Sequence, residues 1–401
     1  MTPKLRFPEF KDNWKLVRLN EVASLVNGLT YDPSMICDEG ILVLRSSNVQ
    51  NGILTYADNV FVDVTDYNSV KEGDVLMCVR NGSRSLIGKT AVIDKAAAGL
   101  AFGAFMVVVR SKSIENQSFL SQVFQTNIFF RDVHRNLGAT INSINNSSLN
   151  KFQFGIPSNT TETKKLGSFF ELLSYKINLL TKKKEALETC KKGLMQKIFS
   201  QELRFKRDDG TDYPEWTSYK LSKILIEHKK RSNGSEQVHS VSVHKGVVNQ
   251  IEHLGRSFAA KDVSNYNKVL FGDIIYTKSP TGDFPYGIIK QSYVENAIVS
   301  PLYCVTSPID INIGYLLHWF FESKVNVHNY LHPIIQKGAK NTINITNNTF
   351  LSRSLSLPSD KAEREKIKVV YSSLNDNLKT LESEILKVTE FKKGLLQQMF
   401  V

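Results

Sequence analysis

The sequence lacks the features that mark several protein classes. It has four cysteines, Cys37, Cys78, Cys190 and Cys304, and no two of them have the close spacing of a zinc site or a redox pair. We therefore expect reduced, structural thiols, as in a cytoplasmic protein. The longest apolar run, Ala96 to Val109, is shorter than the roughly 18 residues that a membrane-spanning helix needs. The charged segment Met1 to Phe10 has no apolar signal region, so we expect a cytoplasmic chain without membrane contact.

The known signatures of catalytic sites are also missing. There is no G-x-x-x-x-G-K-[ST] loop for nucleotide phosphates, no G-x-G-x-x-G, and no His-Glu-x-x-His metal motif. No Pro-Pro dipeptide occurs, which excludes the Asn-Pro-Pro-aromatic signature of amino-methyltransferases. We therefore predict no catalytic, cofactor-binding or metal-ligating residues. An autonomous DNA methyltransferase or nuclease remains the alternative, as does an architectural coiled-coil protein that binds nucleic acid.

The charge of the chain points to a polyanionic partner. Lysine and arginine number 51 against 39 acidic residues, which gives a net charge of +12 and a pI of about 9.3. A surplus of this size favours nucleic acid.

The most informative feature is an internal repeat with a period near 200 residues. Leu5-Arg6-Phe7 recurs as Leu203-Arg204-Phe205, and Trp14 with Leu19 recurs as Trp216 with Leu221. Further matches occur in the same order: Gly73-Asp74 with Gly272-Asp273, Gly138-Ala139 with Gly338-Ala339, Ile156-Pro157 with Leu357-Pro358, and Lys192-Gly193-Leu194 with Lys393-Gly394-Leu395. A repeat this long indicates two whole domains, in contrast to the short units of a solenoid.

Each half reads as a globular part followed by one long helix. Short β-branched and aromatic runs predict strands, with a few helical stretches between them. The clearest strands are Ile41–Leu44, Val75–Val79, Phe105–Val109, Ile274–Tyr276 and Ala297–Val305, and the helical stretches include Phe119–Arg131 and Ile313–Ser323. We expect a mixed α/β (α+β) fold with globular domains at 1–157 and 201–358 and helices at 158–200 and 359–401.

The two helices have a heptad pattern. The seam positions are Leu166, Leu173, Leu180, Leu187 and Leu194 in the first helix and Ile367, Leu374, Leu381, Val388 and Leu395 in the second. Five sustained heptads predict a coiled coil, and the alternative is two amphipathic helices on separate cores. Asn159 and Asp360 each stand three residues before a glutamate, which is the spacing of a capping box. Because like modules pair about a pseudo-twofold axis, we expect the helices to be antiparallel.

Gly193 and Gly394 interrupt the helices at equivalent places. A glycine inside a helix costs about 1 kcal/mol relative to alanine. Its presence in both copies predicts another backbone passing close by, and the alternative is that each helix ends there.

These residues resemble the specificity subunits of Type I restriction-modification systems. The resemblance rests on Pro3-Lys4-Leu5-Arg6-Phe7-Pro8 with Trp14, on both Gly-Asp and Gly-Ala pairs, and on the helix ends Lys192–Phe199 and Lys393–Phe400. It covers the whole chain in the order domain, helix, domain, helix. One departure is Glu162-Thr163 and Glu363-Arg364, where the family often has Glu-Gln.

The resemblance implies a non-catalytic role in DNA recognition. Each globular domain would be a target recognition domain that reads one half of a bipartite site on double-stranded DNA. The helices would space the domains and dock two modification subunits, which carry S-adenosylmethionine and methylate adenine. Restriction subunits would add ATP- and Mg-dependent translocation and cleavage, so this chain itself would bind no cofactor.

Candidate DNA-contacting residues lie in polar turns that follow strands, where recognition residues are often found. Arginine and lysine can read guanine, and asparagine can read adenine. In the first half the candidates are Arg45, Asn48, Arg80, Asn81, Ser83 and Arg84. In the second half they are His244, Lys245, Lys278, Ser279, Thr281, Lys337, Lys340 and Asn341. The lysine-rich segments Lys182–Lys184 and Lys229–Arg231 are interpreted mainly as solvated surface.

Overall fold

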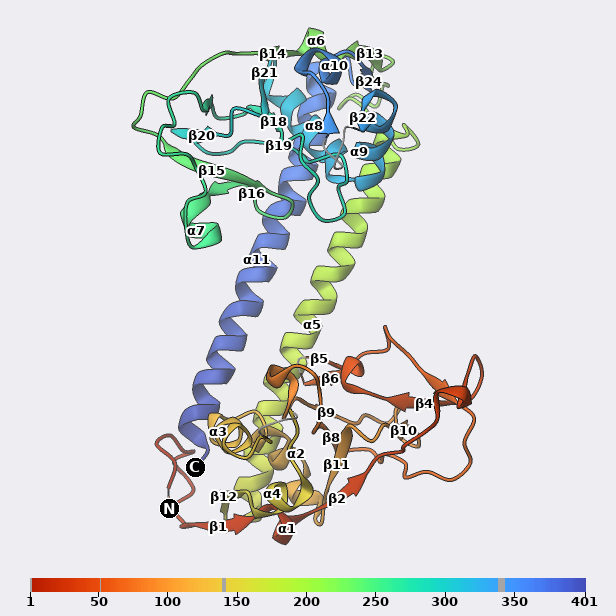
Figure 1. Cartoon of the computed structure of the whole chain (residues 1–401), viewed down its shortest axis with the longest axis vertical. Coiled ribbons are helices and arrows are strands. Elements are labelled where there is room, and N and C mark those ends of the chain that lie inside the picture. The colour runs from red at the N-terminus through yellow and green to blue at the C-terminus, as the bar shows by residue number, and fades with distance from the viewer. Residues whose placement is uncertain (1, 51, 139–141, 338–342) are drawn as a thin grey trace. The chain divides into compact units, whose positions relative to one another are not determined.

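The chain folds into two compact units that share two long helices. The computed structural model describes residues 2–50, 52–138, 142–337 and 343–401. The first unit contains Met1–Lys182 and Glu382–Val401, and the second contains Lys183–Leu381. Helix α5 (Thr160–Phe199) has 40 residues and helix α11 (Lys361–Met399) has 39, and each contributes one part to each unit (Figure 1). A mixed helix-and-strand fold with two long helices was predicted, and this prediction is confirmed.

The first unit is built on small sheets with short helices between their strands. Its sheets, in spatial order, are β1 (Trp14–Arg18) with β12 (Gln153–Pro157); β10 (Ala101–Phe102), β4 (Ile41–Leu44), β7 (Phe61–Val62) and β3 (Ile36–Cys37); β2 (Ala23–Asn27), β11 (Met106–Ser111), β8 (Val75–Cys78) and β9 (Thr90–Val92); and β5 (Val49–Gln50) with β6 (Ile53–Leu54). Its short helices are α1 (Leu19–Val22), α2 (Ile114–Val123), α3 (Asn127–Arg135) and α4 (Asn146–Lys151).

The second unit repeats this plan. Its sheets are β13 (Thr217–Lys220) with β24 (Ser354–Leu357); β14 (Leu225–Glu227), β21 (Cys304–Pro308), β18 (Ile274–Tyr276) and β19 (Ile289–Gln291); β16 (Gly246–Asn249), β15 (Gln237–Ser242), β20 (Ala297–Val299) and β17 (Asn267–Val269); and β22 (Gln336–Lys337) with β23 (Ile343–Asn344). Its short helices are α6 (Leu221–Ile224), α7 (Gln250–Leu254), α8 (Ile311–Glu322), α9 (Lys324–Leu331) and α10 (Asn347–Leu351). The order β14-β21-β18-β19 matches β2-β11-β8-β9, so the sequence repeat is also a repeat of topology.

Two predicted elements are each divided in two. The helical stretch predicted over Phe119–Arg131 breaks after α2, because the hydroxyl of Thr126 accepts a hydrogen bond from the backbone N–H of Phe129 and starts α3. The strand predicted over Ala297–Val305 is β20 and β21 with a turn at Ser300–Tyr303. Pro301 lies in that turn and cannot donate to a sheet ladder.

Each unit encloses the start of one long helix and the end of the other. In the first unit, Phe170 of α5 lies 5.5 Å from Phe400 between ring centroids, and both are buried in the core. In the second unit, Met195 and Ile198 of α5 share a core with Ile367 and Tyr371 of α11. Within each unit, residue numbers rise along α5 as they fall along α11, so the paired segments are antiparallel, as predicted.

The predicted seam positions face inward along both helices. Leu166, Ile367 and Leu381 are buried, and the other seven are half-buried. The expectations for Gly193 and Gly394 are wrong, since both helices continue past the glycine to Phe199 and Met399. A Cβ at either position would meet no atom within 4 Å among the described residues.

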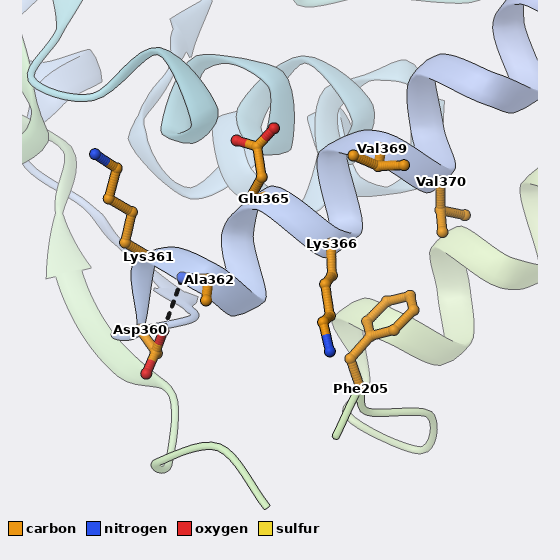
Figure 2. A pocket seen from close by; sticks show the side chains of 8 residues that line it. All are labelled: Phe205, Asp360, Lys361, Ala362, Glu365, Lys366, Val369 and Val370. Carbon is orange, nitrogen blue, oxygen red and sulfur yellow. Dashed lines mark hydrogen bonds between the residues drawn. The ribbon is translucent and has the colours of Figure 1, made fainter. Parts of the chain in front are cut away.

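The start of each long helix explains why the repeat retains an arginine, a tryptophan and a glutamate. Asn159 caps α5 by accepting a hydrogen bond from the N–H of Thr161 at 2.9 Å. Asp360 caps α11 by accepting one from the N–H of Ala362 at 2.7 Å (Figure 2). The glutamate predicted to complete a capping box is instead fully buried in each copy.

Glu162 accepts two hydrogen bonds from Arg6, at 2.6 and 2.7 Å, and one from the indole of Trp14 at 3.3 Å. Glu363 accepts hydrogen bonds from Arg204 and Trp216 in the same way, at 3.1–3.2 Å. A buried carboxylate needs such partners, so this triad fixes each globular part to the start of its own helix.

Candidate nucleic-acid interface

The Gly-Asp motif lies at the start of β8, the strand that precedes the predicted DNA-contacting residues Arg80–Arg84. This segment is called the reading loop below. Gly73 and Gly272 have φ values of 78° and 89°, a backbone conformation that favours glycine. The buried carboxylate of Asp74 accepts hydrogen bonds from the N–H of Lys71 at 2.7 Å and from Arg110 at 2.7 and 3.0 Å. The motif therefore anchors the start of β8, and the predicted DNA-contacting loop at Arg80–Arg84 follows the end of the same strand.

The second copy keeps the aspartate and changes its partners. Asp273 accepts hydrogen bonds from the N–H of Leu270 at 2.7 Å and the hydroxyl of Ser307 at 2.6 Å. The Nε2 atom of His228 lies 2.8 Å from Oδ2 of Asp273, the same oxygen that Leu270 contacts. The same turn thus starts β18 without an arginine.

The loop after β8 is held in one shape by its asparagines. The side-chain oxygen of Asn81 accepts a hydrogen bond from the N–H of Ser83 at 2.9 Å. The backbone of Asn81 donates to the carbonyl of Asn142 at 3.1 Å, and the Asn142 amide donates to the carbonyl of Gly82 at 2.9 Å. A loop constrained in this way can present neighbouring side chains in a fixed geometry.

Two turns that were predicted separately lie side by side in the first unit. The Asn81 amide donates to the hydroxyl of Ser46 at 3.0 Å, which connects the loop at Arg80–Arg84 to the turn at Arg45–Asn48. Arg45 at the start of this turn forms an ion pair with Asp58 at 2.8 Å. The structure therefore brings the six predicted residues of the first half into one region.

The side chains of this region differ in what they can offer to DNA. Arg80, Ser83 and Arg84 are exposed. Asn48 is 0% exposed, and its amide donates to the carbonyl of Thr55 at 3.0 Å. In this structure Asn48 shapes the turn, because no part of it can reach a base edge.

The equivalent loop of the second unit presents fewer cationic groups. Lys278 has a φ of 54°, and its half-buried amino group contacts the side-chain oxygen of Asn347. Burial lowers the pKa of Lys278. Ser279 is exposed and accepts a hydrogen bond from the hydroxyl of Thr281 at 3.3 Å. The two loops thus share a position in the sheet and differ in chemistry.

Two further candidates of the second half lie together in the turn of one hairpin. His244 and Lys245 are exposed in the turn between β15 and β16. Among the described residues, no hydrogen bond links this turn to the loop at Lys278–Thr281. Lys337 belongs to β22, and Lys340 and Asn341 lie outside the described residues.

Sequence reasoning missed two residues of the first region. Asn142 donates a hydrogen bond to the carbonyl of Gly82 in the reading loop, from a segment 60 residues away in the chain. Phe105 has a side chain that is 56% exposed, and the guanidinium of Arg80 lies over its ring at 5.4 Å. Phe105 was assigned to a buried strand, whereas β11 begins one residue later. The glycine at Gly103, two residues earlier, was the signal in the sequence for a turn at this place.

A wide cavity of about 810 Å³ lies at the start of α11. Figure 2 shows Phe205 and Lys366 facing each other there, beside the helix residues Val369 and Val370. It contains none of the predicted DNA-contacting residues. In the described part of the chain, no helix has both the length and the apolar character needed to cross a membrane.

Comparison with known proteins agrees with this architecture. Residues 11–189 match the family described as the Type I restriction modification DNA specificity domain. The StySPI specificity subunit of Salmonella potsdam is 27% identical over 156 residues, which cover 37% of this chain and 33% of that protein. The EcoKI specificity subunit of Escherichia coli K12 is 25% identical over 154 residues, covering 36% and 33%. The aligned region thus spans about a third of the length of these curated relatives.

The fold likeness extends over the whole chain. The crystal structure of the S subunit of a Type I restriction-modification system from M. genitalium has a TM-score of 0.64 and 12% identity, and the alignment covers 100% of this chain and 99% of that one. The chain therefore shares with that S subunit a fold of two modules and two long helices. Residues 11–189 thus carry a match to the Type I restriction modification DNA specificity domain, and the curated relatives that align with this chain are specificity subunits of such systems.

Proposed function

We propose that this chain is the DNA-reading subunit of a Type I restriction-modification complex and has no catalytic activity of its own. The observation that carries the proposal is the repeated framework with different loops. β8 and β18 occupy the same place in equivalent sheets, yet one leads to Arg80–Arg84 and the other to Lys278–Thr281. A shared framework with unlike loops suits a target made of two unlike half-sites.

Partner subunits would supply the chemistry. Two modification subunits would dock on the long helices, bind S-adenosylmethionine and methylate one adenine in each half-site. Restriction subunits would use ATP and Mg for translocation and cleavage. The complex would act on DNA in the cytoplasm. The net charge of +12 supports binding to the phosphate backbone, which gives affinity without sequence preference.

Methylome sequencing tests the proposal directly. A host that expresses this chain with its modification subunit should gain methylated adenine in two short specific blocks separated by a degenerate spacer of roughly 5–8 bp. The control is the same host with the modification subunit alone, which should gain no motif. A continuous palindromic motif, or methylation without this chain, would contradict the proposal.

A further inference from the structure

One turn in each unit presents a large apolar side chain to solvent. In the first unit this is Phe105, between β10 and β11, with 56% of its surface exposed. In the second unit it is Leu302, one place earlier in the equivalent turn between β20 and β21, with 73% exposed. A single exposed apolar residue needs no explanation. Its recurrence at the same turn in both copies calls for one.

The turn of the first unit lies where both predicted loops leave the sheets. The carbonyl of Phe105 accepts hydrogen bonds from the N–H groups of Val79 and Arg80, at 2.9 and 3.2 Å. The N–H of Gly103 donates to the carbonyl of Leu44 at 2.9 Å, at the end of β4. Phe105 therefore stands on a backbone fixed between the turn at Arg45 and the loop at Arg80.

Charge selects a nucleic acid as the occupant of this surface. Arg80 lies over the Phe105 ring at 5.4 Å, and Arg84 is exposed in the same loop. In the second unit, the amide of Asn267 donates to the carbonyls of Ser300 and Tyr303, at 3.3 and 3.0 Å, and its oxygen contacts Arg231. Arg80 beside Phe105, and Arg231 linked through Asn267 to the turn that carries Leu302, match a polyanion whose grooves also carry methyl groups.

We propose that Phe105 recognises the C5-methyl group of a thymine in the first half-site, and that Leu302 does the same in the second. This inference rests on the proposed function and adds a specificity residue to each reading surface. Because Arg80 covers one face of the Phe105 ring, the ring cannot be sandwiched between two base pairs. Contact through its edge and remaining face fits a methyl group in the major groove. Arg80 would be held by the same stacking to read a neighbouring guanine.

Replacing thymine by deoxyuridine tests the contact, since this removes only the methyl group. The full-length chain is titrated with duplexes that carry its methylome-defined target, in which each thymine of both strands is replaced in turn. For the wild type, one replacement in the first half-site should weaken binding about fourfold, as expected for one buried methyl group. Phe105→Ala should lose the sensitivity at that position only, and Leu302→Ala should lose it in the other half-site.

Ile114→Ala is the matched control, because Ile114 is 80% exposed in the same unit and lies at the start of α2. It should leave every sensitivity unchanged. Wild-type protein that binds its target specifically but tolerates deoxyuridine everywhere would overturn the inference and leave the proposed function standing. Enhanced 2-aminopurine fluorescence that depends on Phe105 would also overturn it, since insertion between base pairs would then be the contact. Absence of any sequence-specific binding would overturn both.

Discussion

Arg80 combines an exposed guanidinium with a fixed backbone at the end of β8. If it reads guanine, Arg80→Ala should cost about 1–3 kcal/mol of discrimination at one position of the first half-site. Discrimination in the second half-site should be unchanged. Competition binding with all single-base variants of the target measures both. Lys184→Ala is the control: Lys184 pairs with Glu188 on α5, and its loss should at most weaken binding to every sequence equally. Equal loss of discrimination in both half-sites would show that the reading loop lies elsewhere.

At this scale the sequence indicates the position of a loop better than the direction of its side chains. Arg80 and Arg84 could be chosen because polar turn residues follow a strong strand signal. The inward orientation of Asn48 could not be predicted, because it depends on hydrogen bonds to Thr55 and Asp58 that form only in the folded turn. Lys278 is similar, since its amino group turns toward Asn347 from a segment 69 residues away. Local pattern does not encode such partners.

Among the elements, the long helices were the most predictable part of the fold. A heptad seam depends only on spacing, and spacing is visible in the sequence. The open space beside Gly193 and Gly394 was not predictable, because it depends on which parts of the chain pack against each helix. The short strands near Ser300 were joined in error for a related reason: apolar residues continue through the turn, and only Pro301 marks it.

The two helices also carry equivalent lysines with unlike partners. Lys191 of α5 forms an ion pair with Glu322 at 2.6 Å and donates to Asn375 at 2.8 Å. Lys392 of α11 donates to Gln125 at 2.7 Å and to Ser174 at 2.8 Å, both of them neutral. Burial lowers the pKa of Lys392 from 10.5 to about 8. Glu322 has its pKa lowered to about 2: burial opposes this shift, and contacts with His318 and Lys191 outweigh it.

This contrast predicts an unusual dependence of stability on pH. Between pH 8 and 10.5 the unfolded chain binds more protons at Lys392 than the folded chain, so this lysine destabilises the fold less as the pH rises. Relative to the wild type, Lys392→Met should therefore raise the free energy of unfolding most below pH 8. Its advantage should shrink by at most about 1.4 kcal/mol per pH unit above that. Urea denaturation of the full chain from about pH 7 to pH 10 measures the difference.

Lys191→Met provides the comparison for this experiment. It leaves the Glu322 carboxylate without its cation and should destabilise the chain throughout the same range. An advantage of Lys392→Met that does not change with pH would contradict the lowered pKa.

For the whole molecule, the main consequence of the fold is that neither half of the sequence completes its own core. The core of the first unit includes Leu396, Met399 and Phe400 from the end of the chain. The core of the second includes Met195 and Ile198 from the first half. The repeat and the antiparallel helices together predicted that each helix would end beside the other module. The domain boundaries proposed from the sequence at residues 157, 200 and 358 stay a prediction.

A chain ending at Ser200 tests how interchangeable the two halves are. It loses Phe400, which stacks against Phe119 at 5.0 Å, and keeps Phe199 at the equivalent place of its own helix. Burying a residue of this size is worth about 1.5–3 kcal/mol, so a second copy should supply the missing helix end and form a twofold dimer. With the modification subunit, that dimer should methylate an interrupted palindrome built from two copies of the first half-site.

The dimer of this fragment should also be weaker than the pairing in the whole chain. Lys191 of each copy would meet Gln125 where the whole chain offers Glu322, so each ion pair is replaced by a contact with a neutral amide. Restoring the charge with Gln125→Glu in the fragment should therefore tighten the dimer, and Gln122→Glu, a neighbouring change on α2, should not. Sedimentation equilibrium measures the association constants, and methylome sequencing gives the motif. A monomeric fragment, or a dimer that Gln125→Glu leaves no tighter, would show that the helix ends are not the equivalent parts that the repeat implies.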